Sequence, residues 1–243
     1  MKILFTSDLH GEIDTFKSFV RHLNSDFDIG VISGDLLEDA VTLDVMKETL
    51  SLDEDDLLEE LYDPEDTIED LNERIVAYKT DPESLLSRTL IAKEKEYRDI
   101  LSGTNKKIVV IPGNHDLSKW ESKDNIVNVN MKRYDIAGLN FVGFRYTRLE
   151  ISEEDEYDLL QRIEPLVDKD TILVTHAPPL GIRDKNIHGI SIGSKCIRDL
   201  IEKRNFRLHL FGHVHESFGR HGKHINGAFP KKKRFISIKI GEN

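Results

Sequence analysis

Five short apolar runs, each ending directly at a small polar motif, constrain this 243-residue chain more than any other feature. The runs cover residues 3–6, 29–33, 108–111, 171–175 and 208–211. Near-continuous apolar runs bounded by Gly and Pro are typical of strands buried on both faces of a sheet. In open α/β sheets, sites lie just beyond the carboxyl ends of the strands. The sequence therefore predicts an α/β fold with its polar motifs gathered at one edge.

Helical patterns lie between these runs. Apolar residues recur at spacings of three and four over residues 13–23, with Asp14 as the expected N-cap, and the pattern returns over 152–167 and 194–204. From Asp135 onward the pattern favours antiparallel hairpins instead. It predicts a strand at 139–144, a turn at 221–223 and a closing strand at 235–240. Strands on both sides of the middle predict two packed sheets with helices outside.

The segment at about residues 37–104 differs in composition from the rest of the chain. Between Glu38 and Ile100 there are 21 acidic and 7 basic residues. The whole chain has a net charge of −11, whereas the part outside this stretch has a net charge of +3. We interpret the segment as an acidic insertion of three or four helices within a single domain, residues 1–243. It could be a solvated excursion, a lid over the site, or an arm through which a homo-oligomer forms. The overall acidity therefore says nothing about the substrate.

Composition also bears on compartment. No apolar run approaches the length of a membrane span, and the first apolar stretch is too short for a signal peptide. Cys196 is the only cysteine, so no internal disulfide can form, and we expect a cytoplasmic protein without a membrane partner. Cys196 lies in an apolar-periodic stretch and is interpreted as a small core residue rather than a nucleophile.

The polar motifs supply the donors that divalent metals need. They are Asp8-Leu9-His10, Gly34-Asp35, Gly113-Asn114-His115-Asp116, Thr175-His176 and Gly212-His213-Val214-His215. Imidazole suits Mn, Fe, Zn, Ni or Co, and the lack of thiolate argues against a purely structural zinc. The Asp35 carboxylate could bridge two cations, and Asn114 offers a neutral oxygen. Asp8 and His10 alternate along an extended chain, so they can meet at one ion only if the loop turns there.

Each motif alone is a weak signal, but together and in this order they resemble those of the calcineurin-like metallophosphoesterase superfamily. That signature is D-x-H, G-D-x-x-[DE], G-N-H-[DE], H and G-H-x-H, and the resemblance covers essentially the whole chain outside the insertion. It implies a four-layer αββα sandwich of two mixed sheets that carries a two-metal site.

The resemblance also implies how the ligands are shared. Three residues would hold the first metal: Asp8, His10 and His215. Three others would hold the second: Asn114, His176 and His213. Asp35 would bridge the two metals together with a water or hydroxide. Manganese is the first expectation for both positions, with Fe, Zn, Ni or Co as alternatives.

The activity implied by this arrangement is phosphoester hydrolysis. The bridging hydroxide would attack phosphorus in line, because metal binding lowers the pKa of water from about 15.7 to about 7. In the family, the counterpart of His115 protonates the leaving group or stabilises its developing charge, a task suited to imidazole near neutral pH. Asp116 is expected to orient His115.

Two features indicate a branch of the superfamily. Protein phosphatases carry an Arg shortly after Gly-Asp, whereas this chain continues Leu36-Leu37-Glu38-Asp39. Residues 175–181, 208–216 and 225–228 are similar to those of the small metallophosphoesterase-domain phosphodiesterases and their prokaryotic relatives. We therefore expect a phosphodiesterase acting on small phosphodiesters or nucleotides. The alternatives are a phosphomonoesterase, or a non-catalytic protein that docks partners through its acidic insertion.

Other basic residues have less specific interpretations. His188 follows the Pro178-Pro179 loop and is either a substrate contact or an ordinary loop residue. His209 lies in a predicted strand and is interpreted as a core or surface histidine. Residues 231–234 form a basic run, which we interpret as an exposed loop rather than a nucleic-acid contact, so no nucleic-acid partner is expected.

Overall fold

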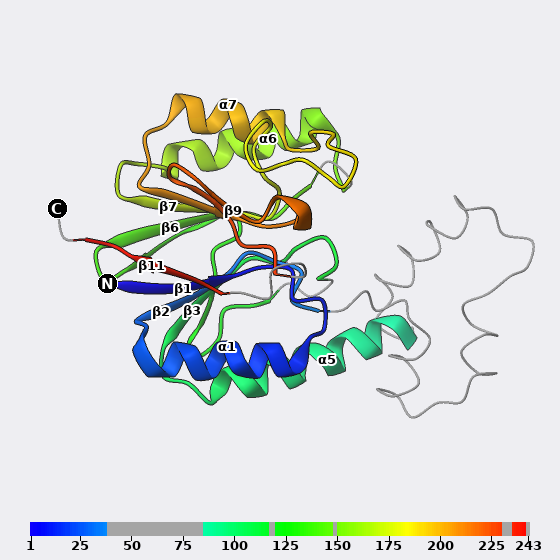
Figure 1. Ribbon diagram of the computed structural model, residues 1–243, viewed down its shortest axis with the longest axis vertical. Helices are drawn as coiled ribbons and strands as arrows, with labels where there is room; N and C mark the ends of the chain where they lie inside the picture. The colour runs from blue at the N-terminus through cyan, green and yellow to red at the C-terminus, as the bar shows by residue number, and fades with distance from the viewer. Residues whose placement is uncertain (38–84, 117–119, 148–149, 230–234, 242–243) are drawn as a thin grey trace, which may run out of the picture.

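The computed structural model describes residues 1–37, 85–116, 120–147, 150–229 and 235–241. Two sheets lie face to face, and helices cover their outer faces (Figure 1). Helices α1 and α5 cover one sheet, and α6 and α7 cover the other. The predicted four-layer αββα sandwich of two mixed sheets is confirmed.

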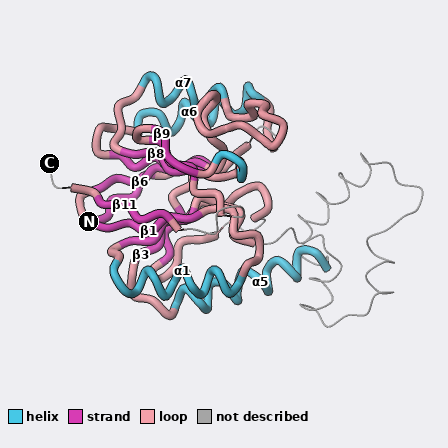
Figure 2. The backbone as a smooth tube through the Cα atoms, in the orientation of Figure 1, coloured by secondary structure: helices cyan, strands magenta, loops and turns pink. Residues whose placement is uncertain are grey.

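The first sheet is built from the beginning of the chain and closed by its end. Its strands, in spatial order, are β11 (Ile236–Lys239), β1 (Lys2–Thr6), β2 (Ile29–Ile32), β3 (Lys107–Val110) and β4 (Ile126–Asn128). The strands from β1 to β4 are parallel, and β11 pairs antiparallel with β1. The carboxyl ends of β1, β2 and β3 therefore lie at one edge, opposite the N-terminus (Figure 2).

The second sheet is mixed. Its strands, in spatial order, are β5 (Arg133–Ile136), β6 (Leu139–Phe144), β7 (Thr171–Thr175), β8 (Leu208–Phe211), β10 (His224–Asn226) and β9 (Gly219–His221). Pairing is antiparallel between β5 and β6 and between β9 and β10, with the turn predicted at 221–223. The hairpin pattern expected from Asp135 onward applies to these two pairs, whereas β6, β7, β8 and β10 are parallel to one another. A helical crossover links β6 to β7 and β7 to β8, and such crossovers connect parallel strands.

Serine caps begin two of the helices. The helices are α1 (Ile13–Asp26), α5 (Leu85–Ser102), α6 (Glu153–Ile163) and α7 (Lys195–Lys203), with 3-10 turns at Glu164–Leu166 and His215–Ser217. Ser152 and Ser194 accept the N–H of the residue three positions on, which satisfies a free donor of the first turn. The Asp14 cap was predicted wrongly: Glu12 holds the N-cap position, and Asp14 lies in the first turn, where its charge favours the helix dipole.

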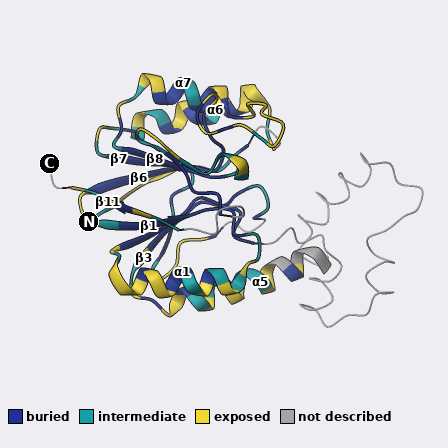
Figure 3. Cartoon of the chain, in the orientation of Figure 1, coloured by how far each residue is buried: buried dark blue, intermediate teal, exposed yellow. Residues whose placement is uncertain are grey.

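Three clusters of buried apolar residues hold the described part of the sandwich together. Figure 3 shows that most of the strand residues are buried. Successive side chains of a strand point to opposite faces, so Ile3 and Phe5 pack between the sheets, while Leu4 packs with Phe16 and Phe19 of α1. The outer layer of the second sheet packs on α6 and α7 and includes the buried Cys196, as expected for a core residue.

Helix α5 is the part of the insertion that the structure describes. Residues 38–84, which carry the other predicted helices, and the basic run at 231–234 lie outside the described residues. The single-domain organisation with an insertion stays a prediction. Over the described part of the chain, no helix is both long and apolar enough to cross a bilayer.

Candidate metal centre

The candidate ligands lie on tight turns that directly follow strands of both sheets. Asp8 (φ 56°), His10 (φ 43°), Asp35 (φ 49°) and His213 (φ 67°) all have left-handed backbone conformations. Few residues other than glycine adopt these angles, although Asp and His do so more often than most. The turn at Asp8 and His10 is the one needed for both side chains to reach the same place.

A first group of donors comprises Asp8, His10 and His215, whose ligand atoms lie within 4.8 Å of one another. His10 Nε2 is 3.2 Å from His215 Nε2, which is 3.4 Å from Asp8 Oδ1. Asp8 is completely buried, and its two oxygens each lie 3.0 Å from the backbone N–H of His213. Asp8 therefore also ties a loop of the first sheet to a loop of the second.

A second group comprises Asp35, His176 and His213, again with ligand atoms within 4.8 Å of one another. Asn114 joins this group, because its Oδ1 lies 2.8 Å from His176 Nε2. His176 Nδ1 lies 2.8 Å from the carbonyl oxygen of Ser33, which can only accept, so Nδ1 carries a proton. That bond orients the ring and leaves Nε2 for a metal, as is usual for metal-binding histidines.

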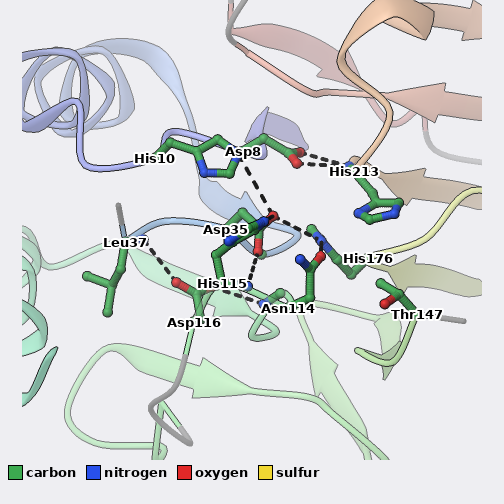
Figure 4. A network of polar contacts seen from close by, with 12 residues as sticks. Asp8, His10, Asp35, Leu37, Asn114, His115, Asp116, Thr147, His176 and His213 are labelled. Carbon is green, nitrogen blue, oxygen red and sulfur yellow. Dashed lines mark hydrogen bonds and ion pairs between the residues drawn. The ribbon is translucent and has the colours of Figure 1, made fainter. Parts of the chain in front are cut away.

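Asp35 lies between the two groups (Figure 4). Its Oδ2 is 3.3 Å from His176 Nε2 in the second group and 3.9 Å from His10 Nε2 in the first. Its Oδ1 accepts the backbone N–H of His115 at 2.9 Å. This is the position expected of a carboxylate shared by two cations.

The two imidazoles of the second group have opposite pKa shifts. Burial alone would raise the pKa of Asp35, but the charge of His176 holds that pKa well below its usual range. Burial alone would lower the pKa of His176, yet Asp35 raises it to about 10. Burial and the charge of His176 lower the pKa of His213 to about 4. The carboxylates thus favour a cation at this place, and the donor set of imidazole, carboxylate and amide oxygen fits divalent metals.

Glycines in the motifs allow the backbone to approach the carboxylates. A Cβ on Gly113 would lie 2.0 Å from Asp35 Oδ1, and one on Gly212 would lie 2.1 Å from Asp8 Oδ2. Any side chain at either position would displace a candidate ligand. The glycines therefore serve close packing against the donors.

His115 lies beside Asp35, with its ring centroid 5.2 Å from that of His10. Its Nε2 is 3.9 Å from Asp35 Oδ2, and its side chain is 30% exposed, so a substrate could reach it. Asp116 is buried and accepts the backbone N–H groups of Leu36, Leu37 and Gly113. Burial and the charge of Asp35 raise the pKa of Asp116 to about 6. These bonds join the loops after β2 and β3, while the orientation of His115 by Asp116 stays a prediction.

The remaining histidines lie apart from both groups. His188 is exposed on the loop between β7 and α7, where its backbone N–H donates to Asn186 Oδ1, and a substrate contact there stays a prediction. His209 is completely buried in β8, with Nε2 2.8 Å from Thr175 Oγ1, which confirms the core interpretation.

Two groups that contribute to the site could not be identified from the sequence. One is the carbonyl oxygen of Ser33, and the other is Arg145, whose Nη2 donates to the carbonyl oxygen of Gly113 at 3.0 Å. A contact through a backbone oxygen depends on chain position rather than residue type. For that reason, no motif signals it.

Comparison with known proteins agrees with this geometry. The family model for calcineurin-like phosphoesterases matches residues 1–217, so the chain belongs to that family. No curated protein matches the chain in sequence.

Solved structures resemble the chain over nearly its whole length. One crystal structure shares 15% identity with a TM-score of 0.63, over 98% of this chain and 94% of the other. The crystal structure of TT1561 of Thermus thermophilus shares 14% identity with a TM-score of 0.53, over 97% of each chain. At these identities the likeness shows the fold alone.

Proposed function

We propose that this chain is a two-metal-dependent phosphodiesterase that hydrolyses small phosphodiesters or nucleotides. The observation that carries the proposal is the pair of donor groups with Asp35 between them and a partly exposed His115 alongside. Family membership supports phosphoester hydrolysis. Two divalent cations held there would supply Lewis-acid activation of water and of the phosphoryl oxygens.

The position of each donor residue indicates which cation it would hold. Asp8, His10 and His215 would hold one cation, and the group with His176 would hold the other. Asp35 would offset the repulsion between the cations with its negative charge. The bond from His176 to the Ser33 carbonyl keeps the imidazole in place, so little reorganisation is needed when a cation replaces the proton.

His115 is the candidate acid for the leaving oxygen. Its backbone is fixed by the bond to Asp35 Oδ1, while its side chain stays partly exposed. Imidazole can donate a proton near neutral pH, and a positioned acid typically contributes 10²–10⁴-fold. The role of His115 would be to transfer this proton from its ring to the departing alkoxide.

The finer assignments have separate support. A diester is favoured by the likeness of residues 175–181 and 208–216 to those of small phosphodiesterases. The lack of an Arg shortly after Gly34-Asp35 argues only against a protein phosphatase. Manganese is favoured by the mixture of imidazole and carboxylate donors. A reducing compartment such as the cytoplasm is favoured by the single cysteine.

The test is hydrolysis of bis-p-nitrophenyl phosphate and p-nitrophenyl phosphate with added Mn²⁺. We expect the diester to give the higher kcat/KM and EDTA to abolish the activity until Mn²⁺ is restored. Asp35→Asn should lower kcat/KM at least about a thousandfold, or about 4 kcal/mol in the barrier. Asp135→Asn makes the same chemical change on β5, where the side chain is 65% exposed, and should leave the activity unchanged.

Three results would contradict the proposal in different ways. A parent protein that is inactive with Mn²⁺, Fe²⁺, Co²⁺, Ni²⁺ and Zn²⁺ would show that the chain does not hydrolyse these esters. Full activity of Asp35→Asn would remove the shared carboxylate from the mechanism. A preference for the monoester would identify a phosphomonoesterase instead.

A further inference from the structure

Arg145 connects the second sheet to the loop that carries Asn114 and His115. It directly follows β6, and its backbone N–H donates to Asn130 Oδ1, beyond the end of β4, at 3.1 Å. Its guanidinium Nη2 donates to the carbonyl oxygen of Gly113 at 3.0 Å. Arg145 therefore crosses from one sheet to the other beside the candidate metal centre.

A carboxylate fixes the guanidinium in this position. Nη2 also lies 2.7 Å from Glu150 Oε1, and its two N–H groups can serve both acceptors at once. Glu150 is itself held, because its Oε2 accepts the backbone N–H of Thr147 at 3.0 Å and the Thr147 hydroxyl at 3.3 Å. The side chains of Arg145 and Glu150 are only 24% and 22% exposed, so solvent screens this pair less than a fully exposed one.

Gly113 transmits this constraint to the ligands. Its N–H is bound by Asp116 Oδ2 at 2.9 Å, and its Cα packs directly against the Asp35 carboxylate. A shift of the Gly113 peptide would therefore move Asn114, whose Oδ1 is 2.8 Å from His176 Nε2. It would also disturb the bond from the His115 N–H to Asp35.

We propose that Arg145, held by Glu150, is a positioning residue that sets the second donor group by fixing the Gly113 peptide. This inference rests on the proposed metal centre. An ordinary ion pair would stabilise the contact between Arg145 and Glu150 without changing metal affinity. A positioning role instead predicts weaker binding at the group that contains Asn114, because outer residues that orient ligands typically contribute 10–100-fold.

The experiment is calorimetric titration of Mn²⁺ into the metal-free protein. Asn114→Ala identifies which binding event belongs to the second group. Arg145→Met, which keeps the apolar stem, should raise the Kd of that event about 10- to 100-fold and change the other less than threefold. Arg145→Lys replaces the planar guanidinium with a single ammonium group, which can make only part of its hydrogen bonds. Its Kd for the second group should therefore lie between those of the parent and of Arg145→Met. In the Asn114→Ala background, Arg145→Met should change the Kd of the second group less than threefold, since both substitutions act on one site.

Two further variants separate positioning from folding. Arg133→Met removes a comparable cation on β5, which contacts Asp135 and Asp168, and should leave both Mn²⁺ affinities unchanged. Glu150→Gln keeps Arg145 but weakens its anchor, and should raise the Kd of the second group about three- to tenfold. Thermal unfolding of each variant shows whether it is folded under the titration conditions.

The outcomes distinguish this inference from the proposed function. If both Arg145→Met and Glu150→Gln bind Mn²⁺ like the parent, the positioning role is wrong. It is also wrong if Arg133→Met weakens binding equally. If the parent binds two Mn²⁺ ions but hydrolyses none of the esters, the proposed function fails while the Kd comparison still tests Arg145. A parent that binds fewer than two Mn²⁺ ions would overturn both.

Discussion

Two buried histidines on adjacent strands have opposite chemical characters. His176 follows β7 and His209 lies within the neighbouring β8, and both side chains are completely buried. The pKa of His176 is raised to about 10, whereas that of His209 is lowered well below 6.5. Burial is the same for both, so the difference must come from their partners.

The partners differ mainly in charge. His176 faces the carboxylates of Asp35 and Asp8, which stabilise an imidazolium and would equally stabilise a metal ion. His209 faces the hydroxyl of Thr175 and the ring of His224. The Thr175 hydroxyl donates to the carbonyl oxygen of Ala177, so it accepts from His209 Nε2–H, and this arrangement suits a neutral ring. A buried histidine is thus a candidate ligand where carboxylates surround it, and a core residue where neutral groups do.

The largest effect should follow from removing the carboxylate that separates the two cases. In metal-free Asp35→Asn, the pKa of His176 should fall from about 10 to near or below its usual 6.5, a change of more than a thousandfold in proton affinity. His209 should stay neutral across the same pH range, because its partners are untouched. Two-dimensional NMR of ¹⁵N-labelled histidine rings, recorded as a function of pH, measures both.

The same measurement could show that Asp35 does not cause the difference between His176 and His209. If His176 kept its high pKa without Asp35, then Asp8 and the Ser33 carbonyl would be sufficient to stabilise its charge. The shared carboxylate would then not be the group that distinguishes the two histidines. Asp135→Asn, on the exposed surface of β5, serves as the matched variant and should leave the titration of His176 unchanged.

A second, smaller effect concerns activity. His176→Gln removes a proposed ligand and should lower kcat/KM for bis-p-nitrophenyl phosphate with Mn²⁺ at least about a hundredfold, beyond the range typical of residues that only orient ligands. His209→Gln makes the same substitution in the neighbouring strand, and we expect kcat/KM within about threefold of the parent. A comparable loss in both variants would mean that the two histidines do not differ in function.

Much of the fold was predictable because its signals are local. Each buried strand that ends at a motif was visible as an apolar run, and Ser152 and Ser194 mark helix starts by their chemistry. Strand direction was less accessible. The pattern after Asp135 was interpreted as antiparallel hairpins, yet the crossovers through α6 and α7 make the middle of that sheet parallel. Alternation reports which face is buried and carries little information on which neighbour a strand meets.

The site was predictable to a different extent. The motifs identified the donor residues, because imidazole, carboxylate and amide oxygen are recognisable in a sequence. They could not show that four of these residues need left-handed backbone angles, nor that Asp116 binds three backbone N–H groups. Arg145 had no signal at all, because its partner at Gly113 is a carbonyl oxygen.

The smallest effect concerns acid stability, and its sign follows from the same comparison. In the unfolded chain His209 binds a proton as the pH falls below about 6.5, but in the folded protein it does not. His209 therefore leaves the free energy of unfolding unchanged above pH 6.5. Below pH 6.5 it lowers that free energy progressively, by at most about 1.4 kcal/mol per pH unit. His224, whose pKa burial lowers to about 4, contributes with the same sign.

His176 should act in the opposite direction in the metal-free protein. Its raised pKa gives stability that is fully present below pH 6.5 and is lost as the pH rises toward 10.

Urea unfolding at pH 7, 6 and 5 can isolate the contribution of His209 to the pH dependence of stability. Between pH 7 and pH 5, His209→Gln should lose about 1–2 kcal/mol less stability than the parent, because groups common to both proteins cancel in the difference. His22→Gln makes the same substitution on the exposed face of α1 and serves as the matched control. If the stability of His209→Gln followed the parent curve, the folded protein would accept a proton at His209, and the contrast with His176 would lose its physical basis.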